Sequence, residues 1–201
     1  MVMVAIIDYG LGNLASVQKS LNYLGIKNTI TNNVHTINKS SSILLPGVGS
    51  YAQGMKNLKE KKLDLILKKE VIDNKKKFLG ICLGMQLIFE KGYEPIPTMG
   101  LGWIKGEVKK IQSNNLRIPH LGWNNVCFNG NFSEDNINCN YYFIHSFHVI
   151  PKNKKVIESY FNYGQKMVAS IRKNNIYATQ FHPEKSQESG LTLLKNFFQN
   201  A

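Results

Sequence analysis

The strongest constraint on the fold is the order in which strand-like and helix-like segments alternate in the first half of the chain. Short apolar runs typical of buried strands stand at residues 2–8, 29–31, 42–45 and 77–81. Apolar residues at helical spacing occupy residues 14–24, 55–72 and 83–90. Strands that alternate with helices are typical of an α/β protein. We therefore expect a doubly wound, mostly parallel central sheet with helices on both faces.

The second half of the chain is a series of strand-like segments separated by turn residues. These segments stand at 104–111, 141–150, 156–160, 167–172 and 176–181. The last two are joined by Lys173, Asn174 and Asn175, which predicts a hairpin and so extra antiparallel strands in the C-terminal half. A closing helix is expected near the C-terminus. No linker interrupts the pattern, so residues 1–201 are expected to form a single domain, two small domains being the alternative.

Composition limits the class of protein. Of the 201 residues, 43% are hydrophobic, which suits a globular domain, and no apolar run is long enough to span a bilayer. The apolar start is short and lacks a basic leader, so it is interpreted as a strand and the protein is expected in the cytoplasm. The three cysteines, Cys82, Cys127 and Cys139, are too few for a disulfide framework and form no CxxC pair that would indicate a zinc site.

The formal net charge of +12 raises the question of nucleic-acid binding. The lysines stand in short runs that flank apolar segments, as at 59–62, 75–77 and 152–155, which is typical of solvated helix faces and turns. A generally basic surface is the favoured interpretation, and no nucleic-acid partner is expected. A basic docking face for a phosphorylated ligand or an acidic partner is the alternative.

A candidate nucleophile stands where the fourth expected strand meets its helix. The segment Gly80-Ile81-Cys82-Leu83-Gly84 has the pattern glycine–x–nucleophile–x–glycine, in which a tight elbow exposes the nucleophile at the carboxyl end of the sheet. The partial positive charge of a helix N-terminus also favours the reactive thiolate. A small buried cysteine is the alternative for Cys82, and it is the favoured interpretation for Cys127 and Cys139, which lack this setting.

A cysteine nucleophile needs a base that a third group holds in place. His182 ends a strand-like segment and is expected at the same edge of the sheet as Cys82, while Glu184 stands two residues further on. We predict that His182 accepts the thiol proton and that Glu184 binds the other imidazole nitrogen, an exposed His–Glu pair being the alternative. His35 is expected in a polar loop, and His145 is expected in the core or in a loop.

An acyl transfer also needs backbone N–H groups that stabilise the negative charge on the carbonyl oxygen. Leu83, directly after the nucleophile, is expected to supply one of them. The turn Pro46-Gly47-Val48-Gly49 ends the neighbouring strand, and the amide of Val48, beside Gly49, is the favoured second donor of this oxyanion hole. An ordinary glycine turn is the alternative, and the two interpretations are compatible.

Together these motifs resemble those of the class I, triad-type glutamine amidotransferases. The resemblance rests on residues 45–49, 80–86 and 180–186. Three more segments, at 8–13, 119–124 and 142–147, are similar to the glutaminase subunits of imidazole glycerol phosphate synthases. The six segments stand in the expected order and span most of the chain, which makes their combination specific.

The resemblance implies the class I glutamine amidotransferase fold, no metal or organic cofactor, and hydrolysis of L-glutamine by Cys82, His182 and Glu184. It also implies a heterodimer with a (β/α)8-barrel cyclase, which uses the ammonia to form imidazole glycerol phosphate and aminoimidazole carboxamide ribotide in histidine biosynthesis. The residues implied to hold glutamine, partly through backbone, are Gly47, Gln86, Glu94, His145 and Ser146. The residues implied to lie at or near the cyclase interface are Asn13, Trp123, Tyr142 and Lys185, with plain surface or packing roles as the alternative.

Three other functions stay open at this point. The same glutaminase chemistry could serve a different barrel-type synthase, because the acceptor binds the partner. Another hydrolase with an elbow cysteine, such as a peptidase, is a second alternative, although the oxyanion turn and the segments after Pro119 favour an amidotransferase. The third is a binding or scaffolding subunit without catalysis, against which the combination of Cys82, His182 and Glu184 argues.

Overall fold

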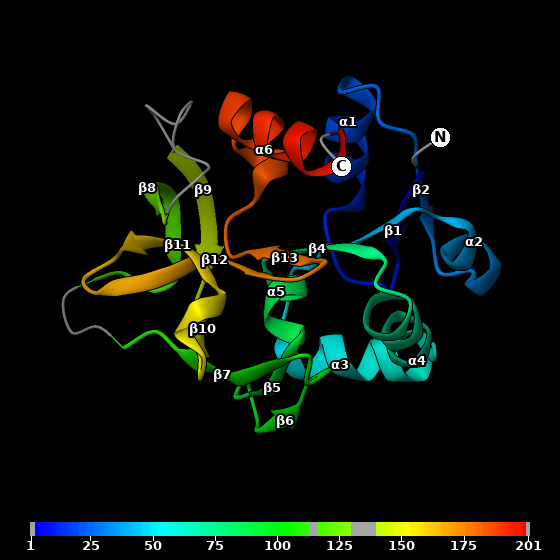
Figure 1. Cartoon of the computed structure of the whole chain (residues 1–201). Coiled ribbons are helices and arrows are strands. Elements are labelled where there is room, and N and C mark those ends of the chain that lie inside the picture. Colours follow the sequence, from blue (N-terminus) through cyan, green and yellow to red (C-terminus); the bar gives the residue numbers. More distant parts are fainter. Residues whose placement is uncertain (1–2, 113–115, 130–139, 200–201) are drawn as a thin grey trace.

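The computed structural model describes residues 3–112, 116–129 and 140–199. A nine-stranded sheet has the strand order β2-β1-β3-β4-β13-β12-β11-β8-β9, and a four-stranded sheet has the order β10-β7-β5-β6 (Figure 1). The larger sheet contains β1 (Val4–Ile7), β2 (Asn28–Thr31), β3 (Ser42–Leu45), β4 (Lys77–Ile81), β8 (His120–Phe128), β9 (Asn140–His145), β11 (Ile157–Asn162), β12 (Lys166–Lys173) and β13 (Ile176–Thr179). The smaller sheet contains β5 (Phe89–Gly92), β6 (Thr98–Met99), β7 (Ile104–Lys110) and β10 (Phe147–Pro151). The helices are α1 (Leu14–Tyr23), α2 (Val34–Lys39), α3 (Tyr51–Glu60), α4 (Leu63–Leu67), α5 (Leu83–Leu87), α6 (Gln187–Gln199), and the short helical turns η1 (Lys68–Asp73), η2 (Lys154–Val156) and η3 (Pro183–Lys185).

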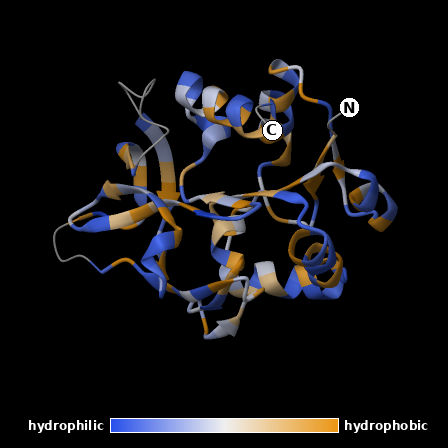
Figure 2. Cartoon of the chain, viewed as in Figure 1, coloured by the Kyte–Doolittle hydropathy of each residue, from blue (hydrophilic) through white to orange (hydrophobic). Residues whose placement is uncertain are grey.

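The strands β2, β1, β3, β4 and β13 are parallel, as the alternation of strands and helices predicts. All of β1 is buried, and its successive residues face opposite layers. Val4 and Ile6 belong to the apolar cluster formed with α1 and α6, whereas Ala5 and Ile7 belong to the cluster formed with α3 and α4. Figure 2 shows hydrophobic and hydrophilic residues on these helices, as expected where one helix face covers the sheet and the other meets water. The sheet is therefore doubly wound.

The predicted hairpin in the C-terminal half is confirmed as β12 and β13, which pair antiparallel across a turn where Asn174 has a φ of 53°. β11, β8 and β9 continue the sheet in antiparallel fashion. β4 and β13 are parallel neighbours, and Ile81 pairs with Thr179. This pairing brings the segments that follow the two strands to the same edge of the sheet.

The strand predicted over residues 141–150 is wrong, because the structure contains two strands in different sheets there. β9 pairs with β8 and ends at His145, whereas β10 pairs with β7 and begins at Phe147. Ser146 is the bend between them. Apolar residues continue on both sides of this bend, so the sequence pattern does not reveal the change of partner. The strands β5, β6 and β8 are likewise absent from the sequence prediction.

The single helix predicted over residues 55–72 is also wrong. α3 ends at Glu60, Lys62 adopts a left-handed φ of 54°, and α4 then leads into the π-helical turn η1. The break changes which side chains face inward. Leu65, expected on the inner face, is 66% exposed, whereas the adjacent Ile66 is buried.

Two smaller expectations also differ from the structure. The helix predicted over residues 83–90 ends at Leu87, because β5 follows it almost directly. Nearly every side chain in this stretch is buried, so no exposed face marks the change from helix to strand. His35, expected in a loop, lies in α2, whose first turn is capped by the Asn33 side chain accepting a hydrogen bond from Thr36 N at 3.1 Å.

Candidate active site

Cys82 lies in a strained elbow between β4 and α5, two elements that Figure 1 shows near the centre of the view. Its φ of 53° and ψ of −107° are rare for a residue with a side chain. The flanking glycines are required, because a Cβ on Gly80 would lie 2.9 Å from Gly84 O and a Cβ on Gly84 would overlap Leu45 O. The structure thus confirms the tight elbow predicted from the sequence.

His182 and Glu184 form a buried pair just after β13. His182 Nδ1 lies 2.8 Å from Glu184 Oε1, and both side chains are almost completely buried. The backbone N–H of His182 donates to Tyr142 O at 2.9 Å, which fixes the histidine against β9. Because an ionised carboxylate can only accept, the proton of this bond belongs to Nδ1. The other ring nitrogen, Nε2, is therefore the one that can exchange a proton with a substrate.

The electrostatics of this pair connect it to Cys82. Burial disfavours a charged imidazole, but the Cys82 sulfur and the Glu184 carboxylate outweigh that effect and raise the pKa of His182 to about 10. Within the described residues, His182 Nε2 is buried and has no hydrogen-bond partner. It is thus available to the thiol or to a leaving group, and bonds of this kind often tighten only when substrate is present.

The turn at residues 46–49 follows β3 and lies against the elbow. A Cβ on Gly47 would lie 2.8 Å from Leu83 Cβ and 3.2 Å from Gly84 N, and it would also overlap the hydroxyl of Tyr9. Gly47 therefore has no room for a side chain. Val48, the next residue, is exposed, and Gly49 has a φ of 114° that favours glycine. The turn is thus close to the site, and the donor role of the Val48 amide stays a prediction.

The residues expected to hold glutamine stand on several different elements. Gln86 is buried on α5, four residues after the cysteine. His145 is buried at the end of β9, and Ser146 follows it at the bend. Glu94 is half-buried beside the start of α3, where its Oε2 accepts a hydrogen bond from Tyr51 N at 3.3 Å, and burial raises the pKa of its carboxyl group. Their contacts with glutamine stay a prediction.

Three of the four residues expected at a partner interface form one surface cluster. Trp123 on β8 pairs with Tyr142 on β9, their ring centroids are 6.0 Å apart, and Lys185 Nζ lies 5.7 Å from the centroid of the Tyr142 ring. Beside them is a depression of about 260 Å³ that Trp123 and Ser186 help to line. The side chain of Asn13 caps α1 by accepting a hydrogen bond from Ser16 N, and its place at the interface stays a prediction.

Two groups in contact with Cys82 were not given a role from the sequence. Gln180 Nε2 lies 3.6 Å from Cys82 Sγ, and Ile144 O lies 3.8 Å from the same sulfur. A glutamine at the end of an otherwise apolar segment is a signal that could have identified Gln180. Ile144 acts through its backbone, which a residue type cannot reveal.

Of the other two cysteines, one lies in the part of the chain that the structure describes. The prediction that Cys127 is buried is wrong, because this residue is exposed on β8, and Cys139 lies outside the described residues. Among residues 3–112, 116–129 and 140–199, no three His, Cys, Asp or Glu side chains are close enough together to hold a metal ion. No helix in that part of the chain is long and apolar enough to cross a membrane.

Sequence comparison identifies the class of protein that this fold and site define. A sequence model of the family described as "Glutamine amidotransferase class-I" matches residues 5–201. The chain belongs to the class-I glutamine amidotransferase family. Within it, the chain is similar to proteins named as HisH subunits of imidazole glycerol phosphate synthase. "Imidazole glycerol phosphate synthase subunit HisH 1" of Campylobacter jejuni is 48% identical over 199 residues, which cover 97% of this chain and 98% of that protein.

Two more relatives carry the same subunit name. "HisH 2" of Methanococcus maripaludis is 43% identical, with 99% of this chain and 100% of that protein covered, and HisH of Aquifex aeolicus is 42% identical, with 98% and 96% covered. Among solved structures, one described as a glutamine amidotransferase has a TM-score of 0.76 at 16% identity and covers 98% of this chain and 99% of its own. PurLQS from Thermotoga maritima has a TM-score of 0.78 at 15% identity, with 99% and 98% covered. These two similarities show the fold.

Proposed function

We propose that this protein is the glutaminase subunit of an imidazole glycerol phosphate synthase and hydrolyses L-glutamine to glutamate and ammonia. The observation that carries the proposal is the Cys82 elbow beside the buried His182–Glu184 pair. Membership in the amidotransferase family supports glutamine as the substrate. The names of relatives that align over nearly the whole chain support the synthase.

The proposed reaction begins when the Cys82 thiolate attacks the side-chain carbonyl carbon of glutamine. The amides of Val48 and Leu83 stabilise the oxyanion that forms. His182, held at Nδ1 by Glu184, donates its Nε2 proton to the leaving nitrogen, so ammonia departs and a thioester with Cys82 is left. Neutral His182 then accepts a proton from water, which attacks the thioester and releases glutamate while the thiolate re-forms.

Glutamine recognition is assigned to groups on both sides of the nucleophile. Gln86 and Glu94 would bind the head group, together with the backbone of Gly47, His145 and Ser146. The position of the bend at Ser146 supports this assignment, because the nearby Ile144 O is 3.8 Å from the Cys82 sulfur. The two ends of the substrate would thus be held by α5, the turn after β3 and the junction of β9 with β10.

The ammonia is proposed to pass to a (β/α)8-barrel cyclase in a cytoplasmic heterodimer. There it would react with a phosphoribulosyl aminoimidazole carboxamide nucleotide to give imidazole glycerol phosphate and aminoimidazole carboxamide ribotide, a step of histidine biosynthesis. The surface cluster of Trp123, Tyr142 and Lys185 is the proposed docking face, and Asn13 is proposed to lie at or near the same interface. Its exposed tryptophan supports that choice, because tryptophan is enriched at protein interfaces.

The test is glutamate release from glutamine by the purified chain, measured alone and with the barrel cyclase of its own organism plus the carboxamide nucleotide. We expect low activity alone and a large rise in the complex, which Cys82→Ala abolishes. If the complex forms and the cyclase accepts free ammonia, yet glutamine hydrolysis does not rise, a different synthase must be the partner. Normal turnover by the Cys82→Ala variant would reject the proposed nucleophile.

A further inference from the structure

The side chain of Gln180 contacts Cys82 but has no role in the mechanism above. Its Nε2 atom lies 3.6 Å from Cys82 Sγ, and the residue is fully buried. Its position follows from the sheet, because β13 and β4 are parallel neighbours and the Cys82 N–H donates to Thr179 O at 2.7 Å. The residue after Thr179 therefore stands beside the elbow.

A second amide, that of Gln86, determines which end of the Gln180 amide faces the sulfur. Gln86 Nε2 lies 3.0 Å from Phe147 O and 3.1 Å from Gln180 Oε1. A backbone carbonyl can only accept a hydrogen bond, so Gln86 must direct its NH2 group toward Phe147. The same NH2 group then meets the oxygen of Gln180. The NH2 group of Gln180 is consequently the end that faces Cys82.

The carbonyl group of Phe147, where this series of hydrogen bonds begins, is itself held in place. His145 Nδ1 lies 2.9 Å from Phe147 O and donates a hydrogen bond to it. His120 Nδ1 lies 3.2 Å from the other nitrogen of His145, so the imidazole has polar partners on both sides. Phe147 O thus accepts from both His145 and Gln86. Each hydrogen-bond donor therefore meets an acceptor along a series that runs from His120 on β8, through His145 on β9 and Gln86 on α5, to Cys82 at the elbow.

We propose that Gln180 is a further catalytic residue, whose Nε2–H group donates a hydrogen bond to the Cys82 thiolate and stabilises it. A thiol needs an acceptor, which Ile144 O provides at 3.8 Å, whereas a thiolate needs a donor, which Gln180 provides. The same donor would stabilise the thiolate expelled when the thioester breaks down. The effect on turnover rests on the proposed glutaminase function, but the contact with the sulfur does not.

The experiment compares the pH dependence of Cys82 alkylation by iodoacetamide in the full chain and its variants, followed by mass spectrometry of the Cys82 peptide. Gln180→Glu keeps an acceptor for Gln86 but turns a carboxylate oxygen toward the sulfur. We expect its pH midpoint to rise by about one unit or more, so that alkylation at pH values below the wild-type midpoint slows at least about tenfold. Gln180→Met, which has neither donor nor charge, should shift the midpoint upward by less.

The matched control is Gln53→Glu, which adds the same charge at an exposed position on α3 and should leave the midpoint unchanged. The ionisable groups that influence the sulfur or its base are His182, Glu184, Tyr9 and His145, and all four are kept in every variant. A shift in Gln180→Met therefore reports the lost donor, and the larger shift expected in Gln180→Glu adds the effect of a negative charge beside the sulfur.

An unchanged midpoint in folded Gln180→Glu and Gln180→Met would overturn the proposal. A lower melting temperature with an unchanged midpoint would also overturn it, because a residue that only packs in the core would change stability without changing the reactivity of the thiol. Glutamine hydrolysis is measured separately, in the complex with the cyclase. A shifted midpoint together with a wild-type complex that hydrolyses no glutamine would reject the proposed function and leave the role of Gln180 toward the sulfur intact.

Discussion

His182 is buried, and burial alone would lower the pKa of an imidazole. The Cys82 sulfur and the Glu184 carboxylate outweigh this effect and raise the pKa from its ordinary value of 6.5 to about 10. Between these two values the folded protein holds a proton that the unfolded chain has released. The contribution of His182 to stability is therefore complete below pH 6.5 and is lost as the pH rises through about 10.

Removing the sulfur should weaken this pH dependence. In Cys82→Ala the pKa of His182 falls, so the free energy of unfolding should decrease less steeply than in the wild type between about pH 8.5, above which an unfolded thiol has also lost its proton, and pH 10. Urea denaturation at several pH values measures the two slopes. Cys127→Ala, which removes an exposed cysteine, is the matched control and should keep the wild-type slope. Identical slopes for Cys82→Ala and the wild type would contradict this account.

Sequence reasoning could predict those residues of the candidate site whose pattern is local. Cys82 stands between two glycines in an elbow pattern, and His182 stands two residues before Glu184, so each could be recognised without a structure. Gln180 could not be assigned a role in the same way. The end of its amide that faces the sulfur depends on Gln86, which lies 94 positions away in the chain.

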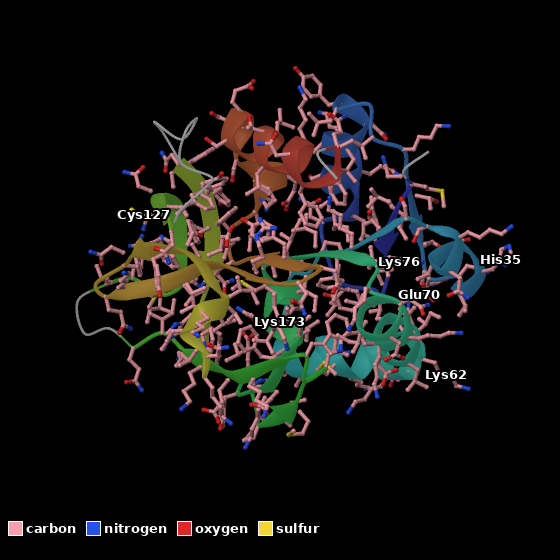
Figure 3. The ribbon with its side chains drawn as sticks, viewed as in Figure 1. His35, Lys62, Glu70, Lys76, Cys127 and Lys173 are labelled. Carbon is pink, nitrogen blue, oxygen red and sulfur yellow. The ribbon has the colours of Figure 1, made fainter. Side chains whose placement is uncertain are left out.

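Individual elements are also held by polar groups, and the clearest case ties β4 to α2. Lys76 Nζ lies 2.6 Å from Glu70 Oε2, and the two side chains are only 10% and 6% exposed. The same nitrogen donates to Ile37 O at 2.8 Å and to Asn38 O at 2.9 Å. Figure 3 shows the labelled Glu70 and Lys76 together at this end of the molecule. The ion pair and these hydrogen bonds thus connect η1, the residue just before β4 and the end of α2.

Breaking this ion pair from one side should destabilise the fold strongly. Lys76→Met leaves the buried Glu70 carboxylate without its cation, and we expect it to lower the free energy of unfolding by about 3–5 kcal/mol. The double variant Lys76→Met/Glu70→Gln removes the uncompensated charge and should recover much of that loss. Chemical denaturation measures both variants. A loss below about 1 kcal/mol for Lys76→Met would show that the pair is not buried in this way.

The elements that could be predicted from the sequence are those whose residue pattern is typical of only one kind of element. The buried parallel strands and the hairpin follow from apolar runs and turn residues. The break at Lys62 does not follow from the sequence in this way. Apolar residues continue on both sides of it, and only the direction in which their side chains point changes. The bend at Ser146 is hidden for a similar reason, since the strands on its two sides find partners in different sheets. Tertiary pairing decides both cases.

At the scale of the whole molecule, the proposed docking face predicts which surface aromatic residue matters for assembly. Trp123 is 44% exposed and lies beside Tyr142 and Lys185. Trp123→Ala should weaken binding of the barrel cyclase at least about tenfold, because large aromatic side chains carry much of the energy of interfaces. Isothermal titration calorimetry measures the affinity. Tyr23→Ala is the control, since Tyr23 is 76% exposed at the far end of α1, and equal effects of the two variants would reject this docking face.

The central claim is that Cys82 is the nucleophile of a glutamine-specific site, and covalent labelling tests it most directly. The complex with the cyclase is treated with 6-diazo-5-oxo-L-norleucine, an alkylating mimic of glutamine, and the modified peptide is identified by mass spectrometry. The account predicts one adduct, on Cys82, that excess glutamine prevents and that is absent from Cys82→Ala. An adduct on Cys127 or Cys139 instead, or labelling of Cys82 that glutamine does not slow, would contradict it.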